Sequence, residues 1–168
     1  MGMDKWTLWH IGLSVKNIDE AVKYYKSLGG KADDNPGRVL DSTNFKEFTS
    51  YGKTDAPPWK IKIKMANLGP LMLELTEPVE GDNYNTTYMR EHGEGANHIA
   101  FQVDDLAAEV KELQDKGVPA MYYAKGAYAY MDARKVGGVV IELFQKRDRP
   151  PGPPPGAPYR HKRPWRST

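Results

Sequence analysis

The stretch Trp9–Val15, with the sequence WHIGLSV, has a counterpart in Asn97–Val103, with the sequence NHIAFQV. In both stretches a histidine, His10 or His98, begins an alternation of apolar residues that is typical of a half-buried strand. When the two histidines are aligned, apolar residues five, eight and twelve positions further on also coincide. A long internal period of this kind indicates a duplicated unit whose two copies bury each other's apolar faces.

Each half is predicted to follow the order β-α-β-β-β. The first helix begins after Asn17, a suitable N-cap, and ends at Gly29; the second begins near Asp105 and ends at Gly117. A short helical turn is expected within Asn83–His92, between the halves. The alternation predicts three further strands in each half: approximately Arg38–Phe45, Trp59–Met65 and Leu71–Thr76, then Ala120–Tyr123, Tyr128–Met131 and Gly138–Phe144.

Each half also contains one glutamate flanked by large apolar residues, Glu74 in the sequence MLEL and Glu142 in VIEL. Because strand side chains alternate between faces, Glu74, Glu142, His10 and His98 all point away from their apolar neighbours. A single His or Glu in a strand usually has only a structural role. Two of each at symmetric positions indicate the ligand set of one divalent metal, with Zn, Ni, Co, Mn or Fe all suited to imidazole and carboxylate.

Composition favours one globular domain over residues 1–146. The chain has 168 residues, of which 39% are hydrophobic and 27% charged, and it has no cysteine, which agrees with a cytoplasmic protein. No apolar run reaches the roughly 20 residues of a membrane span, so no membrane partner is expected. Residues 147–168 form a Pro-rich basic tail, predicted to be extended. The tail accounts for the basic pI, so no nucleic-acid partner is inferred.

These residues resemble the vicinal oxygen chelate superfamily, which includes glyoxalase I, methylmalonyl-CoA epimerase, extradiol dioxygenases and bleomycin-resistance proteins. The resemblance covers roughly residues 6–146. It implies an α+β fold in which two βαβββ modules, about residues 6–80 and 95–146, form a cupped mixed sheet with helices outside. It places His10, Glu74, His98 and Glu142 on the four metal-ligand positions, and it implies a homodimer.

Within the superfamily, residues 68–78, 93–101 and 137–143 are most similar to methylmalonyl-CoA epimerases. In those enzymes a glutamate before the third strand of the first module acts as a base, but the matching position here is Pro58. The resemblance to epimerases and glyoxalase I implies an isomerase, epimerase or lyase. Such an enzyme removes a proton next to a carbonyl and stabilises the resulting enolate with the metal. Because proline cannot accept a proton, the base must be another residue. We expect Glu142 or Glu74 to be the base. The substrate would be a small carbonyl or acyl-CoA compound.

Other residues are candidates for substrate binding. Tyr128 and Tyr130 lie in a predicted strand and could line a pocket, although core packing explains aromatic residues in strands equally well. Lys62 shares a strand face with two further lysines, which favours a solvated face but also suits an anionic substrate.

Two alternative functions are compatible with the sequence. An extradiol-type Fe(II) dioxygenase uses two histidines and one carboxylate, and the additional Glu74 argues against it. A metal-free module that sequesters a drug or metabolite has no use for four inward polar groups.

Overall fold

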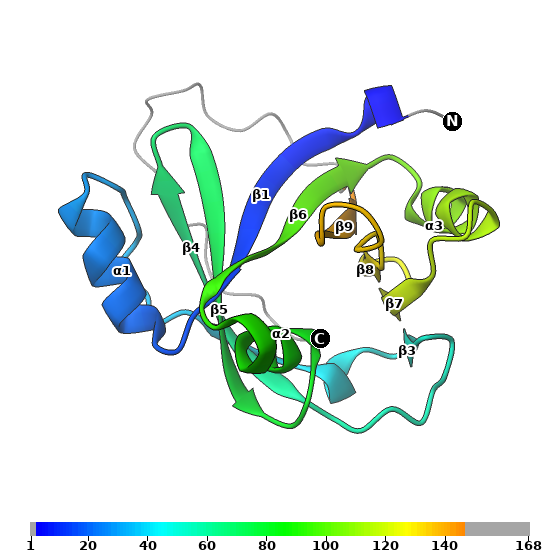
Figure 1. Cartoon of the computed structure of the whole chain (residues 1–168), viewed down its shortest axis with the longest axis horizontal. Coiled ribbons are helices and arrows are strands. Elements are labelled where there is room, and N and C mark those ends of the chain that lie inside the picture. Colours follow the sequence, from blue (N-terminus) through cyan, green and yellow to red (C-terminus); the bar gives the residue numbers. More distant parts are fainter. Residues whose placement is uncertain (1–2, 147–168) are drawn as a thin grey trace, which may run out of the picture.

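Two modules with the same order of elements form the body of the protein, of which the computed structural model describes residues 3–146 (Figure 1). After a short 3-10 turn (Met3–Lys5), the first module contains β1 (Thr7–Ser14), α1 (Ile18–Ser27), β2 (Arg38–Asp41), β4 (Lys60–Leu68) and β5 (Leu71–Glu80). The second contains β6 (Gly95–Val103), α3 (Leu106–Asp115), β7 (Ala120–Ala124), β8 (Tyr128–Met131) and β9 (Val140–Gln145). The predicted pair of βαβββ modules is therefore confirmed. The Pro-rich tail predicted at residues 147–168 lies outside the described residues.

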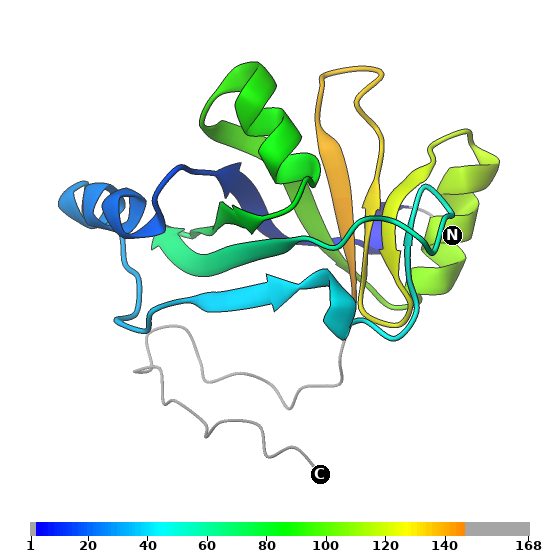
Figure 2. The same ribbon diagram turned by 90° about the horizontal axis from the view of Figure 1, so that it is seen from below.

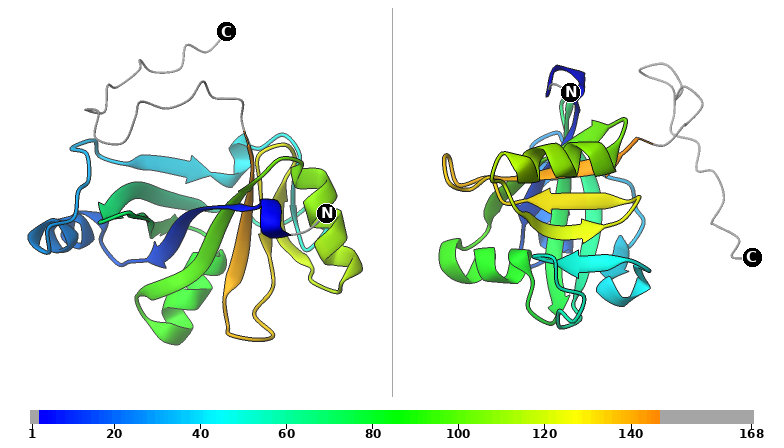
Figure 3. Two further views of the ribbon diagram at one scale, coloured as in Figure 1. Left: turned by 90° about the horizontal axis from the view of Figure 1, so that it is seen from above. Right: turned by 90° about the vertical axis from the view of Figure 1, so that its right-hand side faces the viewer.

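The strands form one nine-stranded mixed sheet in the order β2-β4-β5-β1-β6-β9-β8-β7-β3. At its centre β1 and β6, which carry the two histidines, pair antiparallel. Each of them pairs on its other side with the last strand of its own module, in parallel, as β1–β5 and β6–β9. The four central strands are therefore the four that contain the predicted metal ligands. Figure 3 shows this sheet curling into a half-barrel.

Two helices cover the outer face of the sheet, at opposite ends of the molecule (Figure 2). Under α1 lies an apolar cluster that includes Ile18 and Leu75, both fully buried. Under α3 a second cluster includes Leu106 and Leu143. Burial of each such side chain stabilises the fold by roughly 1.5–3 kcal/mol. Because these apolar residues alternate with the predicted metal ligands, packing of the helices directs the ligands to the inner face.

The link between the modules is more regular than the predicted helical turn. It is the nine-residue helix α2 (Tyr84–His92), whose first turn is capped by the Asn83 side chain. This helix lies against β1, β5 and β6. Its Asn85 contacts Ser14 and Thr76, whose side chains lie on the same strand faces as His10 and Glu74, so α2 adjoins the inner face of the sheet.

The segment between β2 and β4 differs from the prediction. The expected strand Arg38–Phe45 ends at Asp41, because the Asp41 carboxylate accepts the backbone N–H of Thr43 and turns the chain into a 3-10 helix, Ser42–Asn44. A short strand then follows, β3 (Phe48–Ser50), which was not predicted. It pairs antiparallel with β7 of the second module, so a loop of the first module forms the far edge of the sheet.

Within the described residues, no helix is long and apolar enough to cross a membrane.

Candidate metal centre

The four predicted ligands come together on the inner face of the sheet. They belong to β1, β5, β6 and β9, and one donor atom from each lies within 4.8 Å of the donor atoms of the other three. All four residues are buried, with His10 and His98 1% exposed, Glu142 3% and Glu74 5%. Charged and polar groups this deeply buried require partners or a metal.

The distances between these donor atoms suit a shared cation. Oε2 of Glu142 is 3.2 Å from Nε2 of His10 and 3.2 Å from Nε2 of His98. Oε2 of Glu74 is 3.6 Å and 3.5 Å from the same two nitrogens, which are 3.4 Å apart. Two ligands about 2.1 Å from one ion, at bond angles between octahedral and tetrahedral, are roughly 3.0–3.4 Å apart. The donor set therefore fits a divalent metal ion without large rearrangement.

The electrostatics of the cluster lead to the same conclusion. Burial disfavours a charged imidazole, but hydrogen bonds to Glu142 and Glu74 and the charges of both carboxylates outweigh burial and raise the pKa of His10 to about 9. Against its own burial, the same partners raise the pKa of His98. Burial of Glu74 is likewise outweighed by both histidines, which lower its pKa. The two buried carboxylates thus stabilise a positive charge in the cluster. Protons on the histidines or a divalent cation can provide this charge.

A β-bulge sets the orientation of His98. Gly12 pairs with His98 and Leu13 pairs with Ala96, so Asn97 is an extra residue on β6. The bulge turns Asn97 to the same side as its neighbour, and the Asn97 Oδ1 lies 2.6 Å from Nδ1 of His98. If Nδ1 carries the proton, Nε2 presents its lone pair to the cluster, which is the tautomer that a metal ligand needs.

Asn97 is itself held by a buried polar network. Its amide nitrogen donates to Oγ of Ser14 at 2.5 Å and to Oδ1 of Asn85 at 2.9 Å. Oδ1 of Asn85 also accepts hydrogen bonds from the hydroxyls of Ser14 and Thr76. A connected network of this kind stabilises one arrangement of its side chains, so α2 and β1 together fix the His98 ring.

His10 follows a second bulge but has a different neighbour. Leu8 pairs with Phe101 and His10 with Ala100, so Trp9 is the extra residue on β1. Trp9 packs its ring on His10 at 5.1 Å and edge-on against Phe144 at 4.4 Å, measured between ring centroids. Nδ1 of His10 is buried and has no hydrogen-bond partner in the described part of the chain. Packing therefore supports the Nδ1 side of this ring, while its Nε2 contacts Glu142.

Gly12 leaves the space that the His98 ring occupies. A Cβ atom added at Gly12 would lie 1.7 Å from Cε1 of His98, which no side-chain adjustment short of moving the ring can relieve. The first stretch of the repeat therefore requires glycine at this position, whereas the second has Ala100.

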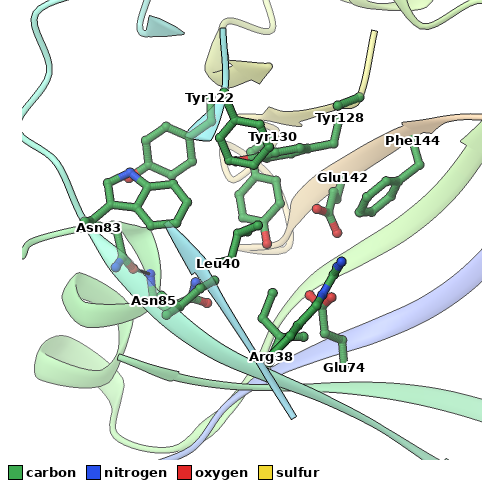
Figure 4. A pocket seen from close by; sticks show the side chains of 15 residues that line it. Arg38, Leu40, Glu74, Asn83, Asn85, Tyr122, Tyr128, Tyr130, Glu142 and Phe144 are labelled. Atoms are coloured by element: carbon green, nitrogen blue, oxygen red, sulfur yellow. Dashed lines mark hydrogen bonds between the residues drawn. The ribbon is translucent and has the colours of Figure 1, made fainter. Parts of the chain in front are cut away.

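A cavity of about 120 Å³ opens onto the two carboxylates (Figure 4). Its wall includes both predicted substrate-binding tyrosines, Tyr128 and Tyr130. Lys62 does not line it. This lysine lies between Ile61 and Ile63, which face the cavity, so it points to the opposite face, where its ammonium group is 3.5 Å from Asp19 of α1.

Two other carboxylates, Glu47 and Asp55, belong to the segment that precedes Pro58 in the sequence. Glu47 forms an exposed ion pair with Lys125, at 2.7 Å, and neither Glu47 nor Asp55 lines the cavity. Pro58 lines a separate surface groove. Of the carboxylates in the described residues, Glu74 and Glu142 are those that face the cavity.

Four polar residues of the cavity wall were not identified from the sequence: Arg38, Trp59, Asn83 and Asn85. Arg38 and Trp59 flank the loop that contains β3, and both asparagines lie at the start of α2. The sequence signal for Asn83 was that of a helix cap, a role it does have. No local pattern indicated that these segments converge on one cavity.

The fold and this cluster define the class of the protein. Residues 9–137 match the family model of the Glyoxalase/Bleomycin resistance protein/Dioxygenase superfamily, and the chain belongs to this superfamily.

Known proteins similar to this chain include both characterised and uncharacterised members. The uncharacterized protein YqjC of Bacillus subtilis is 26% identical over 144 residues, which cover 82% of this chain and 91% of YqjC. Human mitochondrial methylmalonyl-CoA epimerase is 22% identical over 143 residues, 81% of this chain and 72% of the human protein. A variant of Streptomyces coelicolor methylmalonyl-CoA epimerase, solved in complex with 2-nitronate-propionyl-CoA, has a TM-score of 0.60 at 20% identity. That alignment covers 85% of this chain and 96% of the other.

Proposed function

We propose that the protein is a divalent-metal-dependent enzyme that moves a proton on a carbon next to a carbonyl group, as an isomerase, epimerase or lyase. The observation that carries this proposal is the buried cluster of two histidines and two glutamates, with both carboxylates facing a cavity. His10, Glu74, His98 and Glu142 would hold the metal ion. Bound there, the ion would act as a Lewis acid toward the oxygen that gains negative charge when the proton leaves.

The base is one of the two cavity carboxylates. Either Glu142 or Glu74 would accept the proton from the carbon and return it to the same or a neighbouring carbon, so that no other reactant is consumed. Support comes from the cavity wall, which has no third carboxylate among the described residues. Tyr128 and Tyr130 would contact the substrate. The similarity to methylmalonyl-CoA epimerases makes acyl-CoA compounds the first substrates to test.

Metal analysis of the purified protein is the first test. We expect close to one equivalent of a transition metal and a rise in melting temperature on adding it to metal-free protein. Less than a tenth of an equivalent, with no stabilisation by any of Zn²⁺, Ni²⁺, Co²⁺, Mn²⁺ or Fe²⁺, would contradict the proposal.

Isotope exchange tests the reaction. Metal-loaded protein incubated with methylmalonyl-CoA or with 2-oxo acids in D₂O should introduce deuterium next to the carbonyl, without consuming O₂. Oxygen consumption in the absence of exchange would instead support the dioxygenase alternative, which the fourth buried ligand, Glu74, disfavours.

Glutamine variants identify the base. Glu142→Gln and Glu74→Gln each keep an oxygen ligand but remove the proton acceptor, so the one at the base should lose exchange by about 100-fold or more. Glu47→Gln, which changes an exposed carboxylate outside the cavity, is the matched control. Full exchange in Glu142→Gln with metal bound would exclude Glu142, and the same result in both variants would exclude this mechanism.

The homodimer implied by the family resemblance stays a prediction, which sedimentation equilibrium of the full chain would test.

A further inference from the structure

The central cavity and a surface groove lie on either side of one phenylalanine. The cavity has a volume of about 120 Å³ and opens onto Glu74 and Glu142, whereas the groove has a volume of about 580 Å³. Among the described residues, Phe45 is the only one that lines both. Its ring centroid is 5.3 Å from that of Tyr128 in the cavity wall and 5.9 Å from that of Phe48 in the groove wall. Phe45 therefore separates the cavity from the groove.

Phe48 extends this partition along the groove. It lines the groove but not the cavity, and its ring centroid lies 5.9 Å from that of Trp59 and 5.6 Å from that of Tyr122, which both line the cavity. Two phenylalanine side chains thus form a layer between the cavity and the groove. Because a phenyl ring has no polar handle, this layer limits the available space and does not recognise a particular polar group.

Both phenylalanines belong to a connection, residues 42–59 between β2 and β4, that is much longer than its counterpart in the second module. The counterpart, between β7 and β8, is the turn of residues 125–127. Long connections are uncommon in compact domains and are usually functional. In Figure 1 this connection leaves the first module and places β3 beside β7 of the second. The partition is therefore a feature of the first module alone.

The connection is held at its base and at its tip. At the base, the N–H of Ser42 donates to the carbonyl of Trp59 at 3.0 Å, and the N–H of Trp59 donates to the Ser42 hydroxyl at 2.9 Å. At the tip, β3 pairs with β7 and Glu47 forms an ion pair with Lys125. None of these contacts uses the ring of Phe45, so we expect the connection to stay in place when that side chain is shortened.

We propose that Phe45, supported by Phe48, is a specificity-determining residue that limits the size of the group bound next to the buried cluster. A cavity of about 120 Å³ is slightly smaller than the roughly 150 Å³ cavity that takes up benzene, and so holds about five or six non-hydrogen atoms. Removal of the Phe45 ring joins the cavity to the groove and admits longer groups. The inference rests on the proposed function, because it says which substrates that site admits.

A single introduced thiol tests the partition in the absence of metal. The chain has no cysteine, so Leu40→Cys places one reactive group in the cavity wall. We expect methyl methanethiosulfonate to label this thiol about ten-fold or more faster than octyl methanethiosulfonate, because an octyl group overfills the cavity. Mass spectrometry measures both rates, and each is divided by the rate for the same protein unfolded in guanidinium chloride. Adding Phe45→Ala should bring the ratio of the two rates close to one.

Two further variants control this experiment. Phe45→Leu keeps most of the packing and should give an intermediate ratio, which decides the question if Phe45→Ala does not fold. Tyr24→Ala shortens an exposed aromatic side chain on α1, outside the partition, and should leave the ratio unchanged. A ratio near one while Phe45 is present, or a ratio that neither Phe45 variant lowers, would overturn the proposal.

Ligands of the metal connect this test to the proposed function. Acetohydroxamate and octanohydroxamate have the same chelating group but differ in length, and the visible absorption of Co²⁺-loaded protein reports their binding. The protein should prefer acetohydroxamate by about ten-fold or more, and Phe45→Ala should remove the preference. If both compounds bind equally well while Phe45 is present, only the size limit fails. If no divalent ion binds, the proposed function fails, while the labelling ratio still decides the role of Phe45.

Discussion

Each module contributes one histidine and one glutamate to the buried cluster, but the two modules hold their histidines in different ways. In the second module, Asn97 at the bulge contacts Nδ1 of His98 and connects it to α2. In the first module, Trp9 occupies the equivalent bulge and only packs on His10, whose Nδ1 has no partner in residues 3–146. The position of the histidine is therefore the same in both modules, while the residue before it differs. At Nδ1, the ring of His98 is therefore oriented by a hydrogen bond and the ring of His10 by packing.

The largest effect is expected where the two halves differ in the space around the histidine. Gly12→Ala places a methyl group within the His98 ring and should abolish metal binding and lower stability by several kcal/mol. Ala100→Gly, at the equivalent position of the second module, should cost only about 1 kcal/mol. Metal titration and thermal unfolding of both variants check this. Normal metal affinity in Gly12→Ala would show that the ring can move, contrary to the comparison.

The stability of the metal-free protein is expected to depend on pH through the protonation of His10. Because the folded pKa of His10 is raised from 6.5 to about 9, the resulting stabilisation is complete below pH 6.5 and is lost as the pH rises through 9. The loss amounts to at most about 3 kcal/mol. For Glu74, whose pKa is lowered, stabilisation is present above pH 4.5 and is lost in acid.

Thermal unfolding between pH 6 and 9.5, with and without saturating Zn²⁺, measures this dependence. We expect the melting temperature to fall with pH only in the metal-free protein, because the metal replaces the protons on both histidines. In His10→Asn the fall should be smaller. An unchanged dependence in this variant would assign the titration to another group.

Asn97→Leu removes the hydrogen bond to His98 while keeping a side chain of similar size. We expect metal affinity to decrease 10- to 100-fold, as is usual when the partner of a ligating histidine is lost. Trp9→Phe, at the equivalent bulge, should weaken binding less than about three-fold, because packing on His10 is largely kept. Competition titrations with a chelating dye measure both. Equal losses would mean that the two bulges support their histidines equally.

The smallest effects are expected at the outer helices, where the two modules are alike. Asn17→Ala and Asp105→Ala remove the N-caps of α1 and α3, whose side chains accept backbone N–H groups. Each should destabilise the protein by about 1 kcal/mol. Metal affinity should be unchanged, because the caps lie on the outer face of the sheet, away from the cluster. Chemical denaturation with and without metal tests this, and a change in metal affinity for either variant would contradict the separation between outer helices and inner centre.

Elements that depend on short-range interactions could be predicted from the sequence, whereas those that depend on contacts between distant residues could not. Tyr128–Met131 was predicted with its observed bounds, because alternation within a strand is local. The strand that begins at Arg38 was predicted to be too long, because the Asp41 side chain turns the chain after residue 41. The edge strand Phe48–Ser50 was not predicted, because its partner β7 is distant in sequence. Arg38 and Trp59 were missed at the cavity for the same reason.

The sequence by itself determined the two-module order and the face on which His10, Glu74, His98 and Glu142 lie. This was possible because side chains alternate with a period of two in every strand and the helices must cover the apolar face. Only the tertiary structure decided how the site is supported and what it can bind. The bulges at Trp9 and Asn97, and the cavity beside the cluster, depend on how β1 pairs with β6 and on how loops far apart in the chain meet. Such pairings are set by the packing of the whole molecule and leave no periodic pattern in any one segment.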